Sequence, residues 1–331
     1  MPGPDPADGP PAPARHLSSA VTKAAMLLQN EVLRAVREFL GGEGFVELLP
    51  PVIGPVTDPG ARGSKQLDVD YYGHRYKVMT SGILYKQASL LAFDKLFFIA
   101  PNVRAEPVET CSTRRHLAEF HQIDVEIAGG DRVAAMGVAE RMLTHVVKHV
   151  LTTATEQLDA LGRDHGALAR LLEGPFDVLS HREAVTALHG LDYPQSPDAE
   201  IEWTGEEILS RQAARPFFVT DYPKGSRGFY DRESTEEPGR LRNFDLLAPE
   251  GYGEIVSGSE READYATIVT RMRETGENPA KYRWYLDVVR QGIPRSAGFG
   301  MGLERLTRFL TGLDAVWQVN AYPKVPGRVA P

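Results

Sequence analysis

The middle of the chain is a series of short strand-like segments joined by short turns. Residues 67–72 and 75–79 read as a hairpin, because only Gly73 and His74 separate them. Further strands are expected at residues 45–49, 96–100, 103–106, 119–128, 176–179, 217–220, 228–231, 240–247 and 253–257. Parallel neighbours would need long crossover connections, whereas tight turns join antiparallel strands. The chain is therefore predicted to be an α+β protein, with an antiparallel sheet flanked by helices.

Helices are expected before, between and after these strands. Apolar residues recur at steps of three and four over residues 19–40, and a second long amphipathic segment covers 131–161. The consecutive glycines Gly41 and Gly42 are expected to end the first helix. Shorter helices are predicted at residues 81–92, 260–274, 279–290 and 302–310, with a Gly-rich turn before the last of them.

The first 16 residues differ in composition from the rest of the 331-residue chain. Proline, alanine and glycine dominate them, which predicts a disordered tail before one catalytic domain over residues 17–331. The formal net charge of −8 lacks the basic excess typical of nucleic-acid binders. The sequence contains no run of about 18 apolar residues, so no membrane-spanning helix is expected. The one cysteine, Cys111, excludes an internal disulfide and agrees with a reducing cytoplasm.

Polar residues alternate along two of the expected strands. Alternation puts the following residues on one face of each strand: Arg104 and Glu106, then Phe120, Gln122, Asp124 and Glu126. Burying so many polar groups without a ligand would be costly, which favours a binding site. A solvated sheet face with cross-strand ion pairs explains the same pattern, so the spacing alone leaves both interpretations open.

Two further clusters lie in the last third of the chain. Glycine occupies every second position from Gly298 to Gly302, which lets another molecule approach the backbone near a helix N-terminus. Close packing alone would explain these glycines nearly as well. Asp245 and Glu254, with Ser257 nearby, form a set suited to Mg²⁺ and phosphate oxygens. An ordinary strand-to-helix junction is the alternative interpretation of that second set.

Taken together, the three clusters resemble the motifs of class II aminoacyl-tRNA synthetases, in the branch for aspartate and asparagine. Gly44-Phe45-Val-Glu-Leu-Leu-Pro50 resembles the dimer-interface motif, Arg104 to Phe120 the second motif, and Gly300-Met-Gly302-Leu-Glu304-Arg305 the third. The resemblance covers about residues 20–327. It is closer still to the archaeal-type asparagine synthetase, on the stretches GPVTDPGARGSKQ, DYYGHRYKVMTSGILYKQ, FFVTDYPKGSRGFY and GEIVSGSERE. The resemblance implies an antiparallel sheet with flanking helices and a homodimer.

The resemblance also implies roles for individual residues. The ATP site would comprise Arg104 on the α-phosphate, Phe120 against adenine, Arg305 on the other face of adenine or the γ-phosphate, Arg115 and His116 at the distal phosphates, and Glu106. Mg²⁺ would be held by Glu254 and Asp245 with Ser257. The amino-acid site would comprise Lys86 and Arg261 on the side-chain carboxylate of aspartate, Asp124 and Ser81 near its amino group, and Gln122.

The implied reaction is adenylation of aspartate by ATP, catalysed by Arg104 and Arg305. Arginines and Mg²⁺ offset the repulsion between two anions and stabilise the charge that develops on phosphate oxygens. Lys86 would face the amide NH₂ of asparagine with a cation, so aspartate is the expected acid. The short tail leaves no room for an anticodon-binding domain, so tRNA is disfavoured as acceptor. The chain is therefore expected to be an aspartate–ammonia ligase that forms asparagine, AMP and pyrophosphate, with ammonia or another amine as acceptor.

Two other hypotheses remain open. Ile83, Arg114 and Trp317 depart from the family pattern near the pocket, which motivates a specialised amide ligase that joins an aspartyl or related adenylate to a different amine. The other hypothesis is a non-catalytic paralogue with a regulatory or RNA-binding role. It predicts damage to the adenylation residues, and those residues are all present in the sequence.

Overall fold

The computed structural model describes residues 9–59 and 64–328. Its strands are β1 (Val46–Glu47), β2 (Ile53–Gly54), β3 (Asp68–Tyr71), β4 (His74–Val78), β5 (Lys95–Val103), β6 (Glu119–Ala128), β7 (Asp177–Ser180), β8 (Phe217–Thr220), β9 (Asn243–Ala248), β10 (Gly253–Arg261) and β11 (Ser296–Gly302). Its α-helices are α1 (Pro13–Leu17), α2 (Ala20–Gly42), α3 (Ile83–Ser89), α4 (Arg132–Thr153), α5 (Thr155–Ala160), α6 (His165–Arg170), α7 (His181–Gly190), α8 (Trp203–Gln212), α9 (Tyr265–Glu274), α10 (Arg283–Arg290) and α11 (Leu303–Thr311). Short 3₁₀ turns are η2 (Val108–Thr113), η3 (Lys224–Ser226), η4 (Pro279–Tyr282) and η5 (Val316–Val319).

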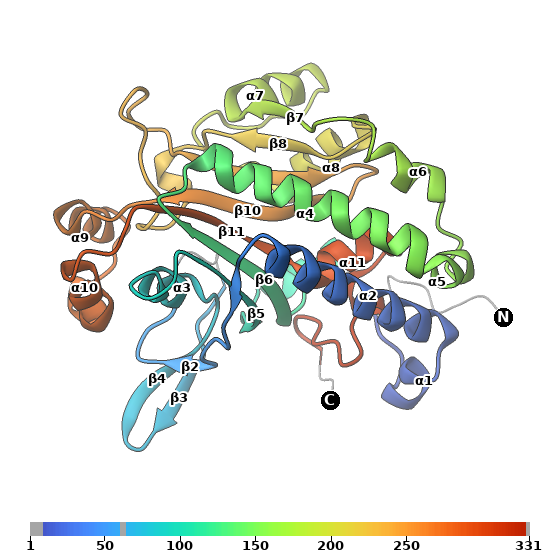
Figure 1. The fold of residues 1–331 in the computed structure, drawn as a ribbon, viewed down its shortest axis with the longest axis horizontal. Helices are drawn as coiled ribbons and strands as arrows, with labels where there is room; N and C mark the ends of the chain where they lie inside the picture. The colour runs from blue at the N-terminus through green and yellow to red at the C-terminus, as the bar shows by residue number, and fades with distance from the viewer. Residues whose placement is uncertain (1–8, 60–63, 329–331) are drawn as a thin grey trace.

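Eight strands form the main sheet, in the order β1-β5-β6-β11-β10-β9-β8-β7. Neighbours are antiparallel except at the two edges, where β1 is parallel to β5 and β7 is parallel to β8. The hairpin of β3 and β4 pairs with β2 in a separate three-stranded sheet. The predicted α+β fold is confirmed, and the long helices α2 and α4 lie across one face of the main sheet (Figure 1).

The two faces of the main sheet differ because alternate residues of a strand point to opposite sides. In β6, Ile123, Val125 and Ile127 pack into the large apolar core with α2 and α4. Burying each side chain of this size contributes about 1.5–3 kcal/mol. The residues between them, Asp124 and Glu126, face the other side and are buried there as well. One face of the sheet is thus the core, and the other is a polar wall.

Residues 298–302, expected to form a Gly-rich turn, belong to strand β11. This strand pairs with β6 on one side and β10 on the other, so tertiary pairing overrides the local turn signal. A Cβ added at Gly298 would collide with the carboxylate of Glu126 and the carbonyl oxygen of Val125. Glycine at this position therefore lets the side chain of a neighbouring strand lie across the backbone.

Three other expected elements differ in detail. The strand expected at residues 228–231 is irregular and is joined to β10 by an isolated bridge between Asp231 and Arg261. The long helix expected over 131–161 divides into α4 and α5 at Ala154. The strand expected at 96–100 is longer than predicted, because the pairing of β5 with β6 continues without interruption from Lys95 to Val103. Of the strand expected at 103–106, only Val103 belongs to β5, and Ala105 forms an isolated bridge with Lys65.

The ordered chain begins earlier than the composition of the N-terminus predicts. Pro13–Leu17 forms α1, with proline in the first turn, where its missing N–H is not needed. His16 is buried, and its Nε2 lies 2.8 Å from the carbonyl oxygen of Asn320. The expected disordered tail therefore does not extend to residue 16. The first eight residues of that tail, and residues 60–63 of the loop GPVTDPGARGSKQ, lie outside the described residues.

Candidate functional site

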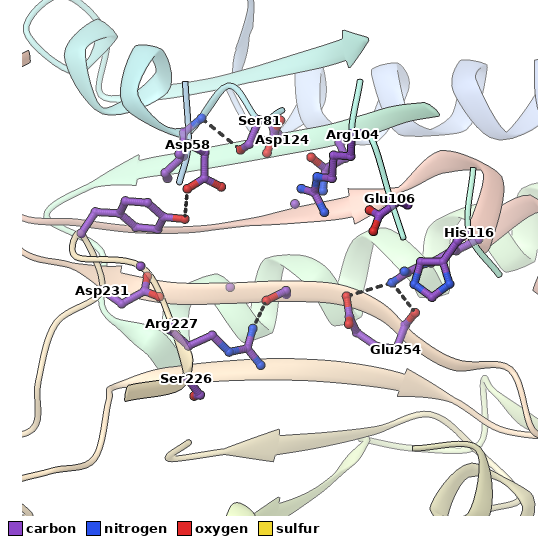
Figure 2. A pocket seen from close by; sticks show the side chains of 18 of the residues that line it. Asp58, Ser81, Arg104, Glu106, His116, Asp124, Ser226, Arg227, Asp231 and Glu254 are labelled. Atoms are coloured by element: carbon purple, nitrogen blue, oxygen red, sulfur yellow. Dashed lines mark hydrogen bonds and ion pairs between the residues drawn. The ribbon is translucent and has the colours of Figure 1, made fainter. Parts of the chain in front are cut away.

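A pocket of about 250 Å³ opens on the polar face of the main sheet (Figure 2). It collects most of the residues singled out from the sequence: Ser81, Lys86, Arg104, Glu106, Arg115, His116, Gln122, Asp124, Glu254, Ser257, Arg261 and Arg305. Phe120 lines a smaller cavity that shares several of these residues. Asp245 is fully buried next to Ser257 and is not among the residues that line the pocket. These residues come from strands β6 and β10, from helices α3 and α11, and from the loops beside them.

Arg104 lines the same part of the pocket as Arg115, His116 and Arg305. Its Nε donates to the carbonyl oxygen of Thr80 at 3.0 Å, and its guanidinium lies 5.0 Å from the centre of the Phe120 ring. Figure 2 shows the guanidinium directed into the pocket, toward the side from which Arg227 approaches. No ion pair among the described residues includes Arg104. Arg104 is therefore a guanidinium poised to take an anion from outside the protein.

Two other arginines of the pocket already have carboxylate partners. Arg305 Nη1 lies 3.2 Å from Glu254 Oε1, and Arg115 Nη1 lies 2.8 Å from Glu206 Oε2. Glu206 comes from α8 and is buried, a role that the sequence interpretation missed. The available signal was its place on the buried stripe of α8 with Gly205 and Leu209. Partnered arginines of this kind are held in position before any ligand arrives.

His116 is a neutral imidazole in this pocket. Burial lowers its pKa to about 2, and the nearby Arg305 and Arg115 act in the same direction. Its Nδ1 lies within hydrogen-bond distance of Thr113 Oγ1, and its ring contacts Trp203 edge to face. His116 can therefore contribute a hydrogen bond to a phosphate, but no positive charge near neutral pH.

We expect the substitution His116→Gln to weaken ATP binding by the same factor at pH 6 and at pH 8. The reason is that His116 has no proton to lose between these values. Titration calorimetry with ATP at both pH values measures the factor. A loss that is clearly larger at pH 6 would mean that a charged imidazole binds the phosphates, which would contradict the assignment.

The inner end of the pocket holds a closely interlocked set of charges around Lys86. Lys86 Nζ lies 3.1 Å from Asp124 Oδ1, 3.5 Å from Glu126 Oε2 and 3.0 Å from the carbonyl oxygen of Phe299. The lysine is only 1% exposed. The positive charge of its ammonium group is therefore balanced by the carboxylates of Asp124 and Glu126. Lys86 acts on a ligand directly and also by holding these two carboxylates in place.

Arg261 is engaged at all three of its guanidinium nitrogens. Nε lies 3.2 Å from Glu126 Oε1, Nη1 lies 2.9 Å from Asp231 Oδ1, and Nη2 donates to the carbonyl oxygen of Gly298 at 3.0 Å. Burial raises the pKa of Asp231, although Arg261 acts in the opposite direction. Asp231 was not singled out from the sequence, because its position depends on an irregular segment. The inner end thus combines two cations with three carboxylates, counting Asp124.

The three residues expected to hold Mg²⁺ lie on neighbouring strands. Asp245 and Ser257 are direct partners in the pairing of β9 and β10, and Glu254 follows across a register shift in β10. Among the described residues, no three His, Cys, Asp or Glu side chains converge as a metal site. Mg²⁺ typically takes one or two carboxylates and completes its shell with water and phosphate oxygens. Asp245 Oδ1 is buried without a hydrogen-bond partner among the described residues, so the donor set fits such an ion.

Comparisons with known proteins agree with this architecture. A family model for class II tRNA synthetases (D, K and N) matches residues 13–326. The asparagine–tRNA ligase of Pyrococcus abyssi is 34% identical over 322 residues, which are 96% of this chain and 71% of that protein. That of Lactobacillus delbrueckii is 36% identical over 93% of this chain and 70% of that protein. The crystal structure of asparaginyl-tRNA synthetase from Pyrococcus horikoshii complexed with asparaginyl-adenylate matches with a TM-score of 0.90 at 32% identity, over 96% of this chain and 73% of that chain. In the described part of this chain, no helix is long and apolar enough to cross a membrane.

Proposed function

The chain belongs to the family of class II tRNA synthetases for aspartate, lysine and asparagine, and on this premise we propose that it is an ATP-dependent, AMP-forming carbon–nitrogen ligase. It activates aspartate as an aspartyl-adenylate and transfers the acyl group to ammonia, which forms asparagine. The observation that supports this proposal most is the division of one pocket into two ends. Arg104, Arg115 and Arg305 lie at one end, and Lys86 and Arg261 at the other. A relative that holds asparaginyl-adenylate in this fold supports the same kind of intermediate here.

The identity of the product determines how aspartate must lie in the pocket. Asparagine carries its new amide on the side chain, so the side-chain carboxylate has to face ATP. The α-carboxylate then lies against Arg261, and the α-ammonium lies near Asp124 or Asp231. This replaces the expectation that Lys86 and Arg261 clamp the side-chain carboxylate, because that orientation would activate the α-carboxylate and give the isomeric α-amide. The mixture of cations and carboxylates at the inner end suits a zwitterionic amino-acid head.

The first chemical step is a displacement at the α-phosphate. An oxygen of the side-chain carboxylate forms a bond to the α-phosphorus, the bond to the bridging oxygen breaks, and pyrophosphate leaves with the electron pair. Arg104 stabilises the charge on the α-phosphate oxygens, and Arg115, Arg305 and neutral His116 bind the leaving pyrophosphate. Phe120 packs against adenine, and Gln122 and Glu106 line the space between the two ends. Mg²⁺, held by Glu254, Asp245 and Ser257, supplies further neutralisation of phosphate charge when it is bound.

The second step needs no nucleophile from the protein. The nitrogen of ammonia attacks the acyl carbon, AMP leaves with its electron pair, and the nitrogen loses a proton. A different amine as acceptor is the alternative, and Ile83 favours it, because this departure from the family pattern lines the pocket beside Ser81. Arg114 and Trp317 do not line the pocket. The family's interface motif supports a homodimer as the working form.

The experiment that tests this function is exchange of labelled pyrophosphate into ATP with a panel of amino acids. We expect aspartate to support exchange, and asparagine to form when ¹⁵N-ammonium is added. Mass spectrometry or NMR locates the label, which should lie in the side-chain amide. An absence of aspartate-dependent exchange would refute the proposal. Exchange with aspartate but no asparagine from ammonium would favour the ligase with another amine, and label in the α-amide would refute the orientation. Aminoacylation of added tRNA would identify the acceptor as tRNA.

A further inference from the structure

Arg227 lies among the oxygen atoms that the metal would use. Its Nη2 is 2.6 Å from Asp245 Oδ2 and 2.6 Å from Glu200 Oε1, and its Nη1 donates to Ser257 Oγ at 2.6 Å. Figure 2 shows Arg227 entering the pocket from the segment that also carries Ser226 and Asp231. Two of the three groups assigned to Mg²⁺ are therefore already occupied by a side chain of the protein.

The arrangement around Arg227 leaves atoms on both partners unsatisfied. Asp245 is fully buried, and its Oδ1 has no hydrogen-bond partner among the described residues. The Nε of Arg227 is also buried without a partner in the described part of the chain. A permanent structural ion pair at full burial normally satisfies such atoms, because leaving them unpaired is costly. The contact with Arg227 thus balances the negative charge of Asp245 but involves only Oδ2, one of its two carboxylate oxygens.

We propose that Arg227 is a placeholder cation for the metal site, which holds Asp245 and Ser257 while no metal is bound and withdraws when Mg²⁺ arrives. This inference rests on the proposed function for the identity of the metal. The guanidinium and the ion compete because two cations beside the same buried carboxylate repel each other. The placeholder keeps Asp245 and Ser257 correctly placed, at the cost of weaker metal binding to the protein alone.

The placeholder is connected to the amino-acid end of the pocket by four residues. Tyr230, on the same segment, donates to Asp58 Oδ1 at 2.8 Å, and the next residue, Asp231, pairs with Arg261. Because Arg227 and Asp231 lie on one short segment, metal binding and amino-acid binding act on the same stretch of chain. Coupling of this kind is reciprocal between the two ligands.

The test measures binding of Mn²⁺, as a probe for Mg²⁺, to the full chain without nucleotide. Electron paramagnetic resonance of free Mn²⁺ gives the affinity without any turnover. We expect Arg227→Met to bind Mn²⁺ at least tenfold more tightly than the unmodified protein. The gain should disappear when Asp245→Asn is added. Arg232→Met is the matched control, because Arg232 lies on the same segment but pairs with Glu260, and it should leave the affinity unchanged.

Arg227→Lys provides a second variant in case the methionine protein does not fold. Lysine keeps the charge but cannot bridge two acceptors as a guanidinium does, so a smaller gain of about threefold is expected. Folded variants that bind Mn²⁺ no more tightly than the unmodified protein would overturn the proposal. Because the measurement needs neither aspartate nor ammonia, its failure is distinct from a failure of the proposed ligase reaction.

Discussion

The substitution Arg104→Ala is expected to reduce aspartate-dependent exchange of pyrophosphate into ATP by about 10²–10³-fold, as removal of one preorganised donor to a developing anion typically does. Arg104 is the guanidinium directed into the pocket without an internal carboxylate partner among the described residues. Its loss therefore leaves no other cation free to take its place. The rate of exchange at saturating ATP and aspartate measures the effect.

The same substitution should leave the fold intact. Arg104 contributes one hydrogen bond, to Thr80, and one contact with the Phe120 ring, so its removal costs little packing. Thermal unfolding and the oligomeric state should match those of the unmodified protein. Arg182→Ala, which removes an exposed arginine that pairs loosely with Glu237, is the control for a loss of charge. Exchange that persists in the folded Arg104→Ala protein would refute the assignment to the α-phosphate.

The substitution Arg261→Met is expected to lower the free energy of unfolding by about 3–5 kcal/mol, the usual cost of removing one partner of a buried ion pair. Glu126 and Asp231 are both buried and both lose their guanidinium partner. Urea unfolding at pH 7 measures the loss, and Arg182→Met should show almost none. A loss below about 1 kcal/mol would mean that the inner charges are not interdependent.

The destabilisation by Arg261→Met should shrink as the pH is lowered. Burial already raises the pKa of Asp231, and Arg261 is the neighbour that opposes this rise. Without Arg261, the folded state holds the proton of Asp231 more tightly than the unfolded state does, so acid favours the folded variant. Urea unfolding at pH 5 and pH 7 checks the sign. A loss that grows toward pH 5 would contradict the role of Asp231.

A substitution at the amino-acid end of the pocket is expected to weaken the binding of aspartate more than the binding of ATP. Lys86→Leu removes the cation between Asp124 and Glu126, and Lys86 pairs with neither Glu206 nor Glu254, the partners of Arg115 and Arg305. The apparent affinity for aspartate should therefore fall by a larger factor than that for ATP, which the exchange assay measures for each substrate separately. Equal weakening of both would argue that Lys86 supports the whole pocket rather than the amino acid.

The sequence predicted best those elements whose signal is local. The period of two along β6 and the apolar run of β8 gave strands at the expected residues, because each pattern reports burial directly. Strand β11 was mistaken for a turn, since its three glycines suggest flexibility until the strands on both sides are known. Residues 228–231 were predicted to form a strand but are irregular, because their aromatic residues are buried without regular pairing to a neighbouring strand.

The site shows the same division between local and tertiary signals. The arginines, Phe120 and the carboxylates of β6 follow from strand alternation and from resemblance to a family. Glu206, Arg227 and Asp231 were missed, because each comes from a helix or irregular segment whose burial depends on contacts far along the chain. Each of them pairs with a residue that was recognised, namely Arg115, Asp245 or Arg261, although Glu200, the second partner of Arg227, was missed as well. Motif residues thus identify one side of these ion pairs, and the fold supplies the other.

The carboxylates that partner the pocket arginines have a consequence for how products depart. Glu206 and Glu254 are tethered beside Arg115 and Arg305, so they compete with any bound phosphate at the high effective concentration of an intramolecular group. Bound pyrophosphate therefore competes for Arg115 and Arg305 with two carboxylates that remain attached to the protein. When pyrophosphate leaves, the two glutamates pair with these arginines again, and pyrophosphate that rebinds has to displace them. The glutamates therefore favour the release of pyrophosphate, and exchange of labelled pyrophosphate into ATP needs a concentration high enough to displace them.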